Sequence, residues 1–136
     1  MSRPTPTVDD YMSRNLITFS PDDDILMAAK ILLTERVSGA PVLDSGGRLV
    51  GMLSKRDCLG IVYASGYHQE WGGRVRDYMS TDVATIDSGT DIIKAAELFM
   101  SSRFRRFPVM ENGRVKGQIS RADLLRALVE HWGSVA

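Results

Sequence analysis

The stretch Val8-Asp9-Asp10-Tyr11-Met12-Ser13 returns 67 residues later as Val75-Arg76-Asp77-Tyr78-Met79-Ser80. This repetition decides the fold, because a sequence that matches itself at a fixed offset encodes one structural unit twice. The same offset joins the pairs Thr18/Thr85, Asp24-Ile25/Asp91-Ile92, Ala28-Ala29/Ala95-Ala96, Arg36/Arg103 and Pro41-Val42/Pro108-Val109. An extra glycine, Gly47, then lowers the offset to 66, at which Gly51, Ser54 and Asp57 match Gly117, Ser120 and Asp123.

Each copy predicts the same order of elements, β-α-β-β-α, and thus a mixed α/β (α+β) fold. The first strands are expected at Leu16-Ile17-Thr18-Phe19 and Val83-Ala84-Thr85-Ile86, which are β-prone runs. A helix follows in each copy, with Asp23 or Thr90 as its expected N-cap. Its apolar face has the spacing i, i+3, i+4, i+7, i+8 and consists of Ile25, Ala28, Ala29, Leu32 and Leu33, or of Ile92, Ala95, Ala96, Phe99 and Met100.

The second half of each copy predicts a hairpin and a helix. The hairpin strands are expected at 40–43 and 49–53, and at 107–110 and 115–119, each pair joined by a glycine-containing turn. The last helix begins after Ser54 or Ser120. The β-α-β step should be a right-handed crossover, which places both helices of a copy on one face of its sheet.

The repeat divides the chain into two expected domains, 8–66 and 75–132. They are preceded by a flexible arm, 1–7, and joined by a linker, 67–74, in which Tyr67 and Trp71 are expected to pack back onto the domains. Solenoids usually need three or more repeats, so two copies should instead pack face to face as one module.

Composition excludes several classes of protein. The chain has 17 basic and 17 acidic residues, so no global field draws it to nucleic acid or to an anionic membrane. No apolar run approaches the roughly 20 residues that cross a bilayer, and we expect the first residues to be a loose arm and not a signal peptide. A single cysteine, Cys58, fits a reducing compartment, so we expect a cytoplasmic protein.

The order of elements, a proline that opens the middle strand, and the motif Gly-h-x-Ser-x-x-Asp before the last helix together resemble the cystathionine-β-synthase (CBS) domain pair. The motif reads Gly51-Met52-Leu53-Ser54-Lys55-Arg56-Asp57 in one copy and Gly117-Gln118-Ile119-Ser120-Arg121-Ala122-Asp123 in the other. The resemblance covers about 8–129. It implies a pseudo-two-fold regulatory module with two clefts between the copies.

The resemblance also implies a ligand and the residues that bind it. In many relatives the clefts hold AMP, ADP, ATP, NAD(H) or S-adenosylmethionine, with Mg²⁺ accompanying ATP, and the signal passes to a partner protein, often as energy sensing. No cofactor is required. The implied ligand-binding residues are Ile17, Thr18, Gly39, Ala40, Pro41, Ser54, Lys55, Arg56 and Asp57, and Ala84, Thr85, Arg105, Arg106, Phe107, Pro108, Ser120, Arg121 and Asp123.

General chemistry agrees with these assignments but leaves an alternative open. A carboxylate suits the vicinal hydroxyls of a ribose, and the N–H groups at a helix start attract phosphate. The same Ser-x-x-Asp spacing is also a capping box, in which Ser54 and Asp57 satisfy only the helix backbone. Thr18 and Thr85 could likewise reflect β propensity alone.

The two copies differ in charge. Arg103, Arg105, Arg106 and Arg121 belong to the second, whereas the first has Lys55 and Arg56 beside the small residues Ser38-Gly39-Ala40. Clustered arginines bind phosphates well, so the cleft of Asp123 is the favoured one, although a solvated arginine face remains the alternative.

The sequence contains no motif that indicates catalysis, and we expect that the protein is not an enzyme. His68 and His131 have no metal-ligand spacing, and neither a phosphate-binding Walker loop nor Gly-x-Gly-x-x-Gly is present. Cys58 corresponds to Leu124 in the other copy, which favours a buried small hydrophobe over a reactive thiol.

A scaffold without ligand is the main alternative function, and a nucleic-acid binder is less favoured. The apolar second helices predict a homodimer.

Overall fold

The computed structural model describes residues 4–64 and 72–133, without the side chains of Tyr63 and Ala64. The first three residues of the expected arm, residues 65–66 of the first expected domain, and most of the expected linker, with Tyr67, His68 and Trp71, lie outside the described residues. The described chain forms two compact units of similar size. We name them the first-repeat unit, Ile17–Val83, and the second-repeat unit, which combines the residues up to Leu16 with those from Ala84 onward.

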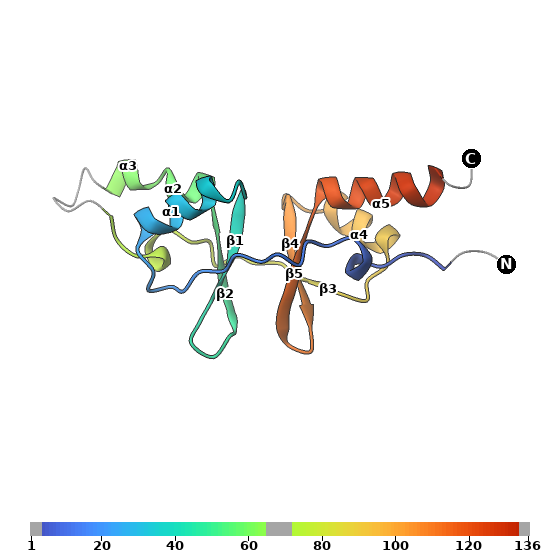
Figure 1. Ribbon diagram of the computed structural model, residues 1–136, viewed down its shortest axis with the longest axis horizontal. Coiled ribbons are helices and arrows are strands. Elements are labelled where there is room, and N and C mark those ends of the chain that lie inside the picture. The colour runs from blue at the N-terminus through green and yellow to red at the C-terminus, as the bar shows by residue number, and fades with distance from the viewer. Residues whose placement is uncertain (1–3, 65–71, 134–136) are drawn as a thin grey trace. The chain divides into compact units, whose positions relative to one another are not determined.

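The first-repeat unit contains a two-stranded antiparallel sheet and three short helices (Figure 1). Its elements are α1 Ile25–Thr34, β1 Gly39–Leu43, β2 Leu49–Ser54, α2 Lys55–Cys58, α3 Ile61–Ala64 and the 3-10 turn η2 Val75–Asp77. β1 pairs with β2 from Gly39 opposite Ser54 to Leu43 opposite Leu49, with one irregularity after Val42. The last helix expected from the sequence is therefore divided: Leu59 caps α2, and Gly60 separates it from α3.

The second-repeat unit has a three-stranded sheet of order β3-β4-β5. Its elements are the 3-10 turn η1 Val8–Asp10, β3 Ile86–Asp87, α4 Ile92–Met100, β4 Arg106–Glu111, β5 Arg114–Ser120 and α5 Arg121–Gly133. β3 runs parallel to β4, and β4 pairs antiparallel with β5. Both α4 and α5 lie on the same side of the β4–β5 hairpin, as expected from the sequence (Figure 1).

The first strand of each copy is shorter than the sequence predicts, and the prediction for 16–19 is wrong as a strand. There only Phe19 bridges Val42, in parallel. Residues 83–85 likewise form no strand, and the further difference between the copies, a second bridge in β3, is explained by Pro21, which stands where the second copy has Ser88. The Ser88 N–H donates to the Met110 carbonyl at 3.0 Å and continues the ladder beyond β3, whereas a proline has no N–H to donate.

The N-caps of the first helices lie one residue later than expected from the sequence. Asp24 accepts a hydrogen bond from the Met27 N–H at 2.9 Å, and Asp91 accepts one from the Lys94 N–H at 2.8 Å. The predictions of Asp23 and Thr90 are therefore wrong. The Asp23 carboxylate instead accepts from the Ser20 N–H at 2.8 Å, which fixes the turn before the helix.

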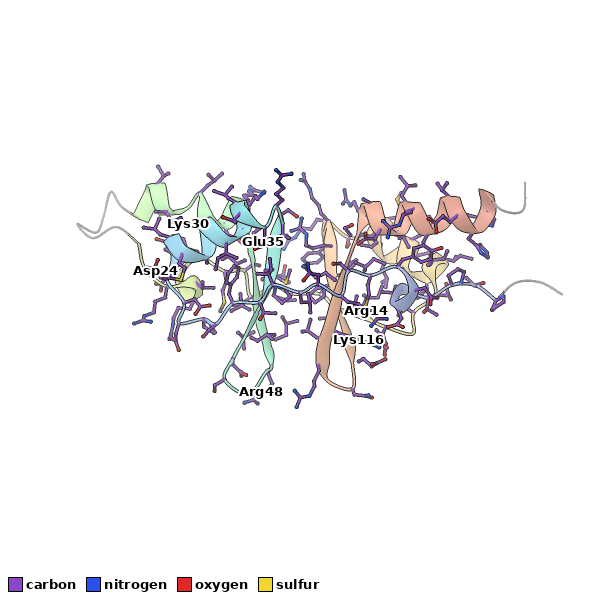
Figure 2. The ribbon with its side chains drawn as sticks, viewed as in Figure 1. Arg14, Asp24, Lys30, Glu35, Arg48 and Lys116 are labelled. Carbon is purple, nitrogen blue, oxygen red and sulfur yellow. The ribbon has the colours of Figure 1, made fainter. Side chains whose placement is uncertain are left out.

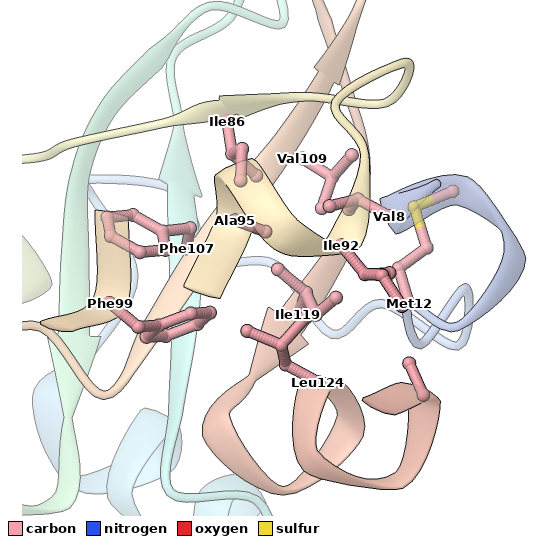
Figure 3. Packing of buried hydrophobic residues seen from close by; sticks show 11 residues of the cluster. Val8, Met12, Ile86, Ile92, Ala95, Phe99, Phe107, Val109, Ile119 and Leu124 are labelled. Carbon is pink, nitrogen blue, oxygen red and sulfur yellow. The ribbon is translucent and has the colours of Figure 1, made fainter. Parts of the chain in front are cut away.

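The apolar faces predicted for α1 and α4 are buried only in part. Ile25, Ala28 and Leu32 are buried, as are Ile92, Ala95 and Phe99, but Leu33 is 66% exposed and Met100 is 88% exposed. In the second-repeat unit this face packs on the strand residues Phe107, Val109 and Ile119 and on Leu124 and Ala127 of α5 (Figure 3).

Each unit takes a segment from the start of the other copy of the sequence. Val8 and Met12 belong to the core of the second-repeat unit (Figure 3), and Val75 belongs to the core of the first-repeat unit. Pro6 also joins the second-repeat unit, because its carbonyl accepts a hydrogen bond from the Ile92 N–H at 3.0 Å. The two copies thus exchange their opening segments, an arrangement that the repeat pattern alone does not predict.

Candidate functional site

The Ser-x-x-Asp motifs form capping boxes in both copies. The Ser54 hydroxyl accepts from the Asp57 N–H at 3.0 Å, and the Asp57 carboxylate accepts from the Ser54 N–H at 2.9 Å. Ser120 and Asp123 repeat this pair of bonds at 3.1 and 3.0 Å. The capping role, which the sequence offered as the alternative to ligand binding, is therefore present in both copies. It does not exclude ligand binding, because only one oxygen of each carboxylate, Oδ2, serves the cap and a carboxylate accepts several hydrogen bonds.

The strand that contains the proline lies directly beside each capping box. Gly39 pairs with Ser54 in the first copy, and Arg106 pairs with Ser120 in the second. The Lys55 N–H donates to the Ser38 carbonyl at 2.9 Å, and the Arg121 N–H donates to the Arg105 carbonyl at 3.2 Å. These bonds hold the start of the last helix against the start of the middle strand in both copies.

The threonine segments lie along the other edge of the same strands. Phe19, which follows Thr18, donates to the Pro41 carbonyl at 3.0 Å. Ile86, which follows Thr85, pairs with Val109. Each copy therefore brings its three expected site segments together on neighbouring stretches of backbone.

Burial divides the expected site residues into three groups. The buried ones are Gly39, Ala40, Pro41, Phe107 and Pro108; the half-buried ones are Ile17, Ser54, Asp57, Ala84, Arg106, Ser120 and Asp123; the exposed ones are Thr18, Lys55, Arg56, Thr85, Arg105 and Arg121. The strand residues thus form the hidden framework, and the threonines and the cations at the helix starts face solvent.

The two copies differ in the helix that follows the box. α2 has only 4 residues, whereas α5 has 13. A longer helix aligns more peptide dipoles, so α5 offers the stronger positive end for an anion. At that end Arg106 is half-buried, and burial followed by the nearby charge of Arg105 lowers the pKa of its guanidinium. A guanidinium that is partly desolvated beside a like charge gains from a bound anion.

The glycines of the two motifs have a role that sequence reasoning missed. A Cβ on Gly117 would lie 2.5 Å from the Ser13 carbonyl oxygen and 2.8 Å from the Met12 sulfur. A Cβ on Gly51 would lie 2.8 Å from both the Ser80 carbonyl oxygen and the Met79 sulfur. Because these glycines lack a side chain, the exchanged segments can pack directly against them. The repeated Tyr-Met-Ser sequence was the signal from which this contact could have been predicted.

Cys58 is buried, as the sequence indicates. Burial, followed by the charge of Asp57, raises the pKa of its thiol, so little thiolate forms near neutral pH. In the part of the chain that the structure describes, no group of three or more His, Cys, Asp or Glu side chains is placed to hold a metal ion. None of the helices within that part is long and apolar enough to cross a membrane.

Comparison with known proteins agrees with this architecture. The CBS domain family matches residues 8–64 and again residues 75–130. The chain therefore belongs to the CBS-domain family, as a tandem pair of CBS repeats.

Relatives of known sequence include proteins of several kinds. An uncharacterized protein of Methanocaldococcus jannaschii is 29% identical over 92% of this chain, which spans 44% of that protein. Inosine-5'-monophosphate dehydrogenase of the same organism is 30% identical over 87% of this chain, which spans 23% of the enzyme. The chain thus corresponds to less than half the length of either relative.

Two solved structures share the fold over nearly the whole chain. The CBS-pair protein CBSX2 of Arabidopsis thaliana, in complex with AMP, is 29% identical and has a TM-score of 0.79, with 91% of this chain and 96% of CBSX2 covered. The CBS domain pair of protein MJ0100, in complex with 5-methylthioadenosine and S-adenosyl-L-methionine, is 23% identical, with a TM-score of 0.79 and coverage of 98% and 100%. The fold expected from the sequence is thus confirmed.

Proposed function

We propose that this chain is a regulatory CBS-pair module that binds an adenosine-containing ligand, such as AMP, ADP, ATP, NAD(H) or S-adenosylmethionine, and signals to a partner protein. The observation that carries the proposal is the convergence in each copy of a threonine segment, a proline strand and a Ser-x-x-Asp helix start. CBSX2, which shares 29% of its residues with this chain, is known in complex with AMP.

The proposed binding mode assigns one task to each segment. Asp57 and Asp123 accept hydrogen bonds from the ribose hydroxyls through the carboxylate oxygen that the cap does not use. The N–H groups and cations at the helix start hold the phosphates. Thr18 and Thr85 face the base from the neighbouring strand edge.

We favour the site of Asp123 for phosphate-bearing ligands. The first support is the length of α5. The second is a group of three arginines, Arg105, Arg106 and Arg121. Their backbones are held close together, because Arg106 pairs with Ser120 and the Arg121 N–H donates to the Arg105 carbonyl. Arg103 contributes less, because its guanidinium lies over the Phe104 ring, 5.6 Å from the centroid.

Thermal unfolding with added nucleotide tests the proposal. A ligand that binds only the folded module stabilises it by about 2.7 kcal/mol at a hundredfold excess over Kd. For a chain of this size that corresponds to a rise in Tm of several degrees. We expect AMP, and ATP with Mg²⁺, to raise Tm and to be recovered unchanged by chromatography.

Other outcomes separate the competing functions. A Tm that no adenosine-containing ligand changes would favour the dimerisation or docking scaffold. A rise in Tm with DNA or RNA would favour nucleic-acid binding. Conversion of ATP to ADP that disappears in the variant with both Asp57→Ala and Asp123→Ala would show a hydrolase and contradict the proposal that the chain is not an enzyme.

We also propose that the chain forms a homodimer in the cytoplasm through its last helices. The apolar side chains of these helices that remain exposed are Leu59, Val62, Leu125, Val129 and Trp132, each more than half exposed. An apolar groove of about 420 Å³ lies between α4 and α5, beside Met100 and Leu125. Such surfaces commonly mark interaction sites. Sedimentation equilibrium should give twice the mass of 15.1 kDa, and a mass of one chain at all concentrations would refute the dimer.

A further inference from the structure

The two exchanged segments present the same groups for docking. The shared side chains are Val8/Val75, Tyr11/Tyr78, Met12/Met79 and Ser13/Ser80. Val8 and Val75 are both fully buried, and Met12 and Met79 lie over the motif glycines of their units. The buried apolar side chains are therefore the same in both segments. The two tyrosine hydroxyls differ in partner, since Tyr11 donates to Glu130 at 2.8 Å and Tyr78 to the Gly72 carbonyl at 2.9 Å.

The backbone hydrogen bonds of the two segments are also equivalent. Val8 donates to the Thr90 carbonyl and Val75 to the Asp23 carbonyl, both at 2.8 Å. Ser13 and Gln118 form a bridge, as do Ser80 and Met52 at the corresponding positions. Either segment could make these bonds with either unit.

The side chains that directly follow the two buried valines differ, because they have opposite charges. Asp9 in the first segment corresponds to Arg76 in the second. In the second-repeat unit, Lys116 Nζ lies 3.1 Å from an Asp9 carboxylate oxygen and 2.8 Å from a Glu111 oxygen. Arg14 also contacts Asp9, at 3.0 Å. Figure 2 labels Arg14 and Lys116.

The first-repeat unit has the opposite arrangement. Arg76 forms an ion pair with the Asp22 carboxylate, and Arg74 donates to the Asp22 carbonyl at 2.7 Å. If the segments docked on the other units, Asp9 would meet Asp22 and Arg76 would meet Lys116. Each segment would then face a charge of its own sign, with Glu111 remaining as the acidic partner of Lys116.

We infer that the ion pairs of Asp9 and Arg76 select the unit on which each opening segment docks, and so specify the exchange between the two copies. Like charges placed against each other disfavour the wrong pairing while opposite charges favour the right one. These side chains thereby supply a distinction that the shared packing and backbone bonds lack.

Thiol crosslinking in the full-length chain tests this inference, in a Cys58→Ala background. The pair Ser13→Cys with Gln118→Cys reports the exchanged pairing, and Ser13→Cys with Met52→Cys reports the unexchanged one. With native charges we expect mainly the 13–118 crosslink. With Asp9→Arg and Arg76→Asp together, we expect its yield to fall at least twofold and the 13–52 crosslink to appear.

The control exchanges two charges elsewhere. Lys30 and Glu35 are exposed on and just after α1 (Figure 2), and Lys30→Glu with Glu35→Lys also preserves the net charge. This control should keep the native crosslinks. Unchanged crosslinks in the Asp9 and Arg76 variant would overturn the inference and assign the exchange to chain connectivity alone.

A second pair of variants keeps the test valid if the double exchange fails to fold. Arg76→Asp alone should lower the yield of a Ser80→Cys, Met52→Cys crosslink at least twofold. Adding Asp22→Arg restores opposite charges and should recover that yield. Failure of Asp22→Arg to restore the crosslink would contradict the inference.

Discussion

At the scale of single residues, Asp123 caps the start of α5 and is also a residue that we propose to bind the ligand. Its Oδ2 accepts the Ser120 N–H, and its Oδ1 lies 3.5 Å from Arg126 in a loose ion pair. The side chain is 21% exposed, so a ligand can reach it. The sequence predicts that the Asp123 carboxylate lies at the start of the last helix. It cannot distinguish capping from ligand binding, because both uses need the same Ser-x-x-Asp spacing.

We expect Asp123→Ala to weaken AMP binding at least tenfold, since it removes charge-assisted hydrogen bonds of about 1.5–3 kcal/mol. Calorimetric titration measures the affinity. Asp91→Ala is the matched control, because it removes the N-cap of α4 outside the proposed site. It should cost about 1 kcal/mol of stability and leave the affinity unchanged. Equal losses of affinity in both variants would show that Asp123 acts only through folding.

Gly117→Ala should destabilise the protein by about 1–3 kcal/mol, because the added methyl group collides with the backbone at Ser13. Urea unfolding measures the change. Gly89→Ala is the control, since the nearest atom to a Cβ there, an Asp87 carboxylate oxygen, is 4.0 Å away. A Gly117→Ala variant as stable as the wild type would contradict the close approach of the exchanged segment.

At the scale of elements, periodicity and turn chemistry predict most of what the structure contains. The 3.6-residue pattern predicts α1 and α4, and the glycine turns predict both hairpins, with Gly47 and Gly113 at positive φ of 80° and 77°. The pattern does not predict the loss of the first strand at Pro21 or the interruption of the last helix at Gly60. It also cannot predict the exchanged segments, since nothing in a repeat says which unit each copy of a segment joins.

The ion pairs around Lys116 predict a dependence of stability on acid. Hydrogen bonding to Lys116 holds the pKa values of Asp9 and Glu111 below their ordinary values of 3.8 and 4.5. A carboxyl with a lowered pKa in the folded state adds stability above its unfolded pKa and loses it as the pH falls through the folded pKa. Urea midpoints should therefore differ between wild type and Lys116→Met near neutral pH and converge below about pH 4. A constant difference down to about pH 3 would contradict this role for Lys116.

At the scale of the whole molecule, the chain presents one CBS architecture twice. Each copy gathers the same three segments, yet the last helix is longer in the second copy. Arg105 and Arg106 lie beside its start, where the first copy has Ser38 and Gly39. We therefore propose two sites of unequal preference, with the site at α5 favoured for anions. The exposed apolar side chains of the last helices are the surface that we propose for the homodimer.

Calorimetric titration of the wild-type protein with AMP measures the proposed binding of an adenosine-containing ligand. We expect saturable binding of at least one AMP per chain, with ATP or S-adenosylmethionine competing for the same sites through their shared ribose. Absence of binding heat for all three ligands, on protein that unfolds cooperatively, would contradict the claim that this chain is an adenosine-sensing module.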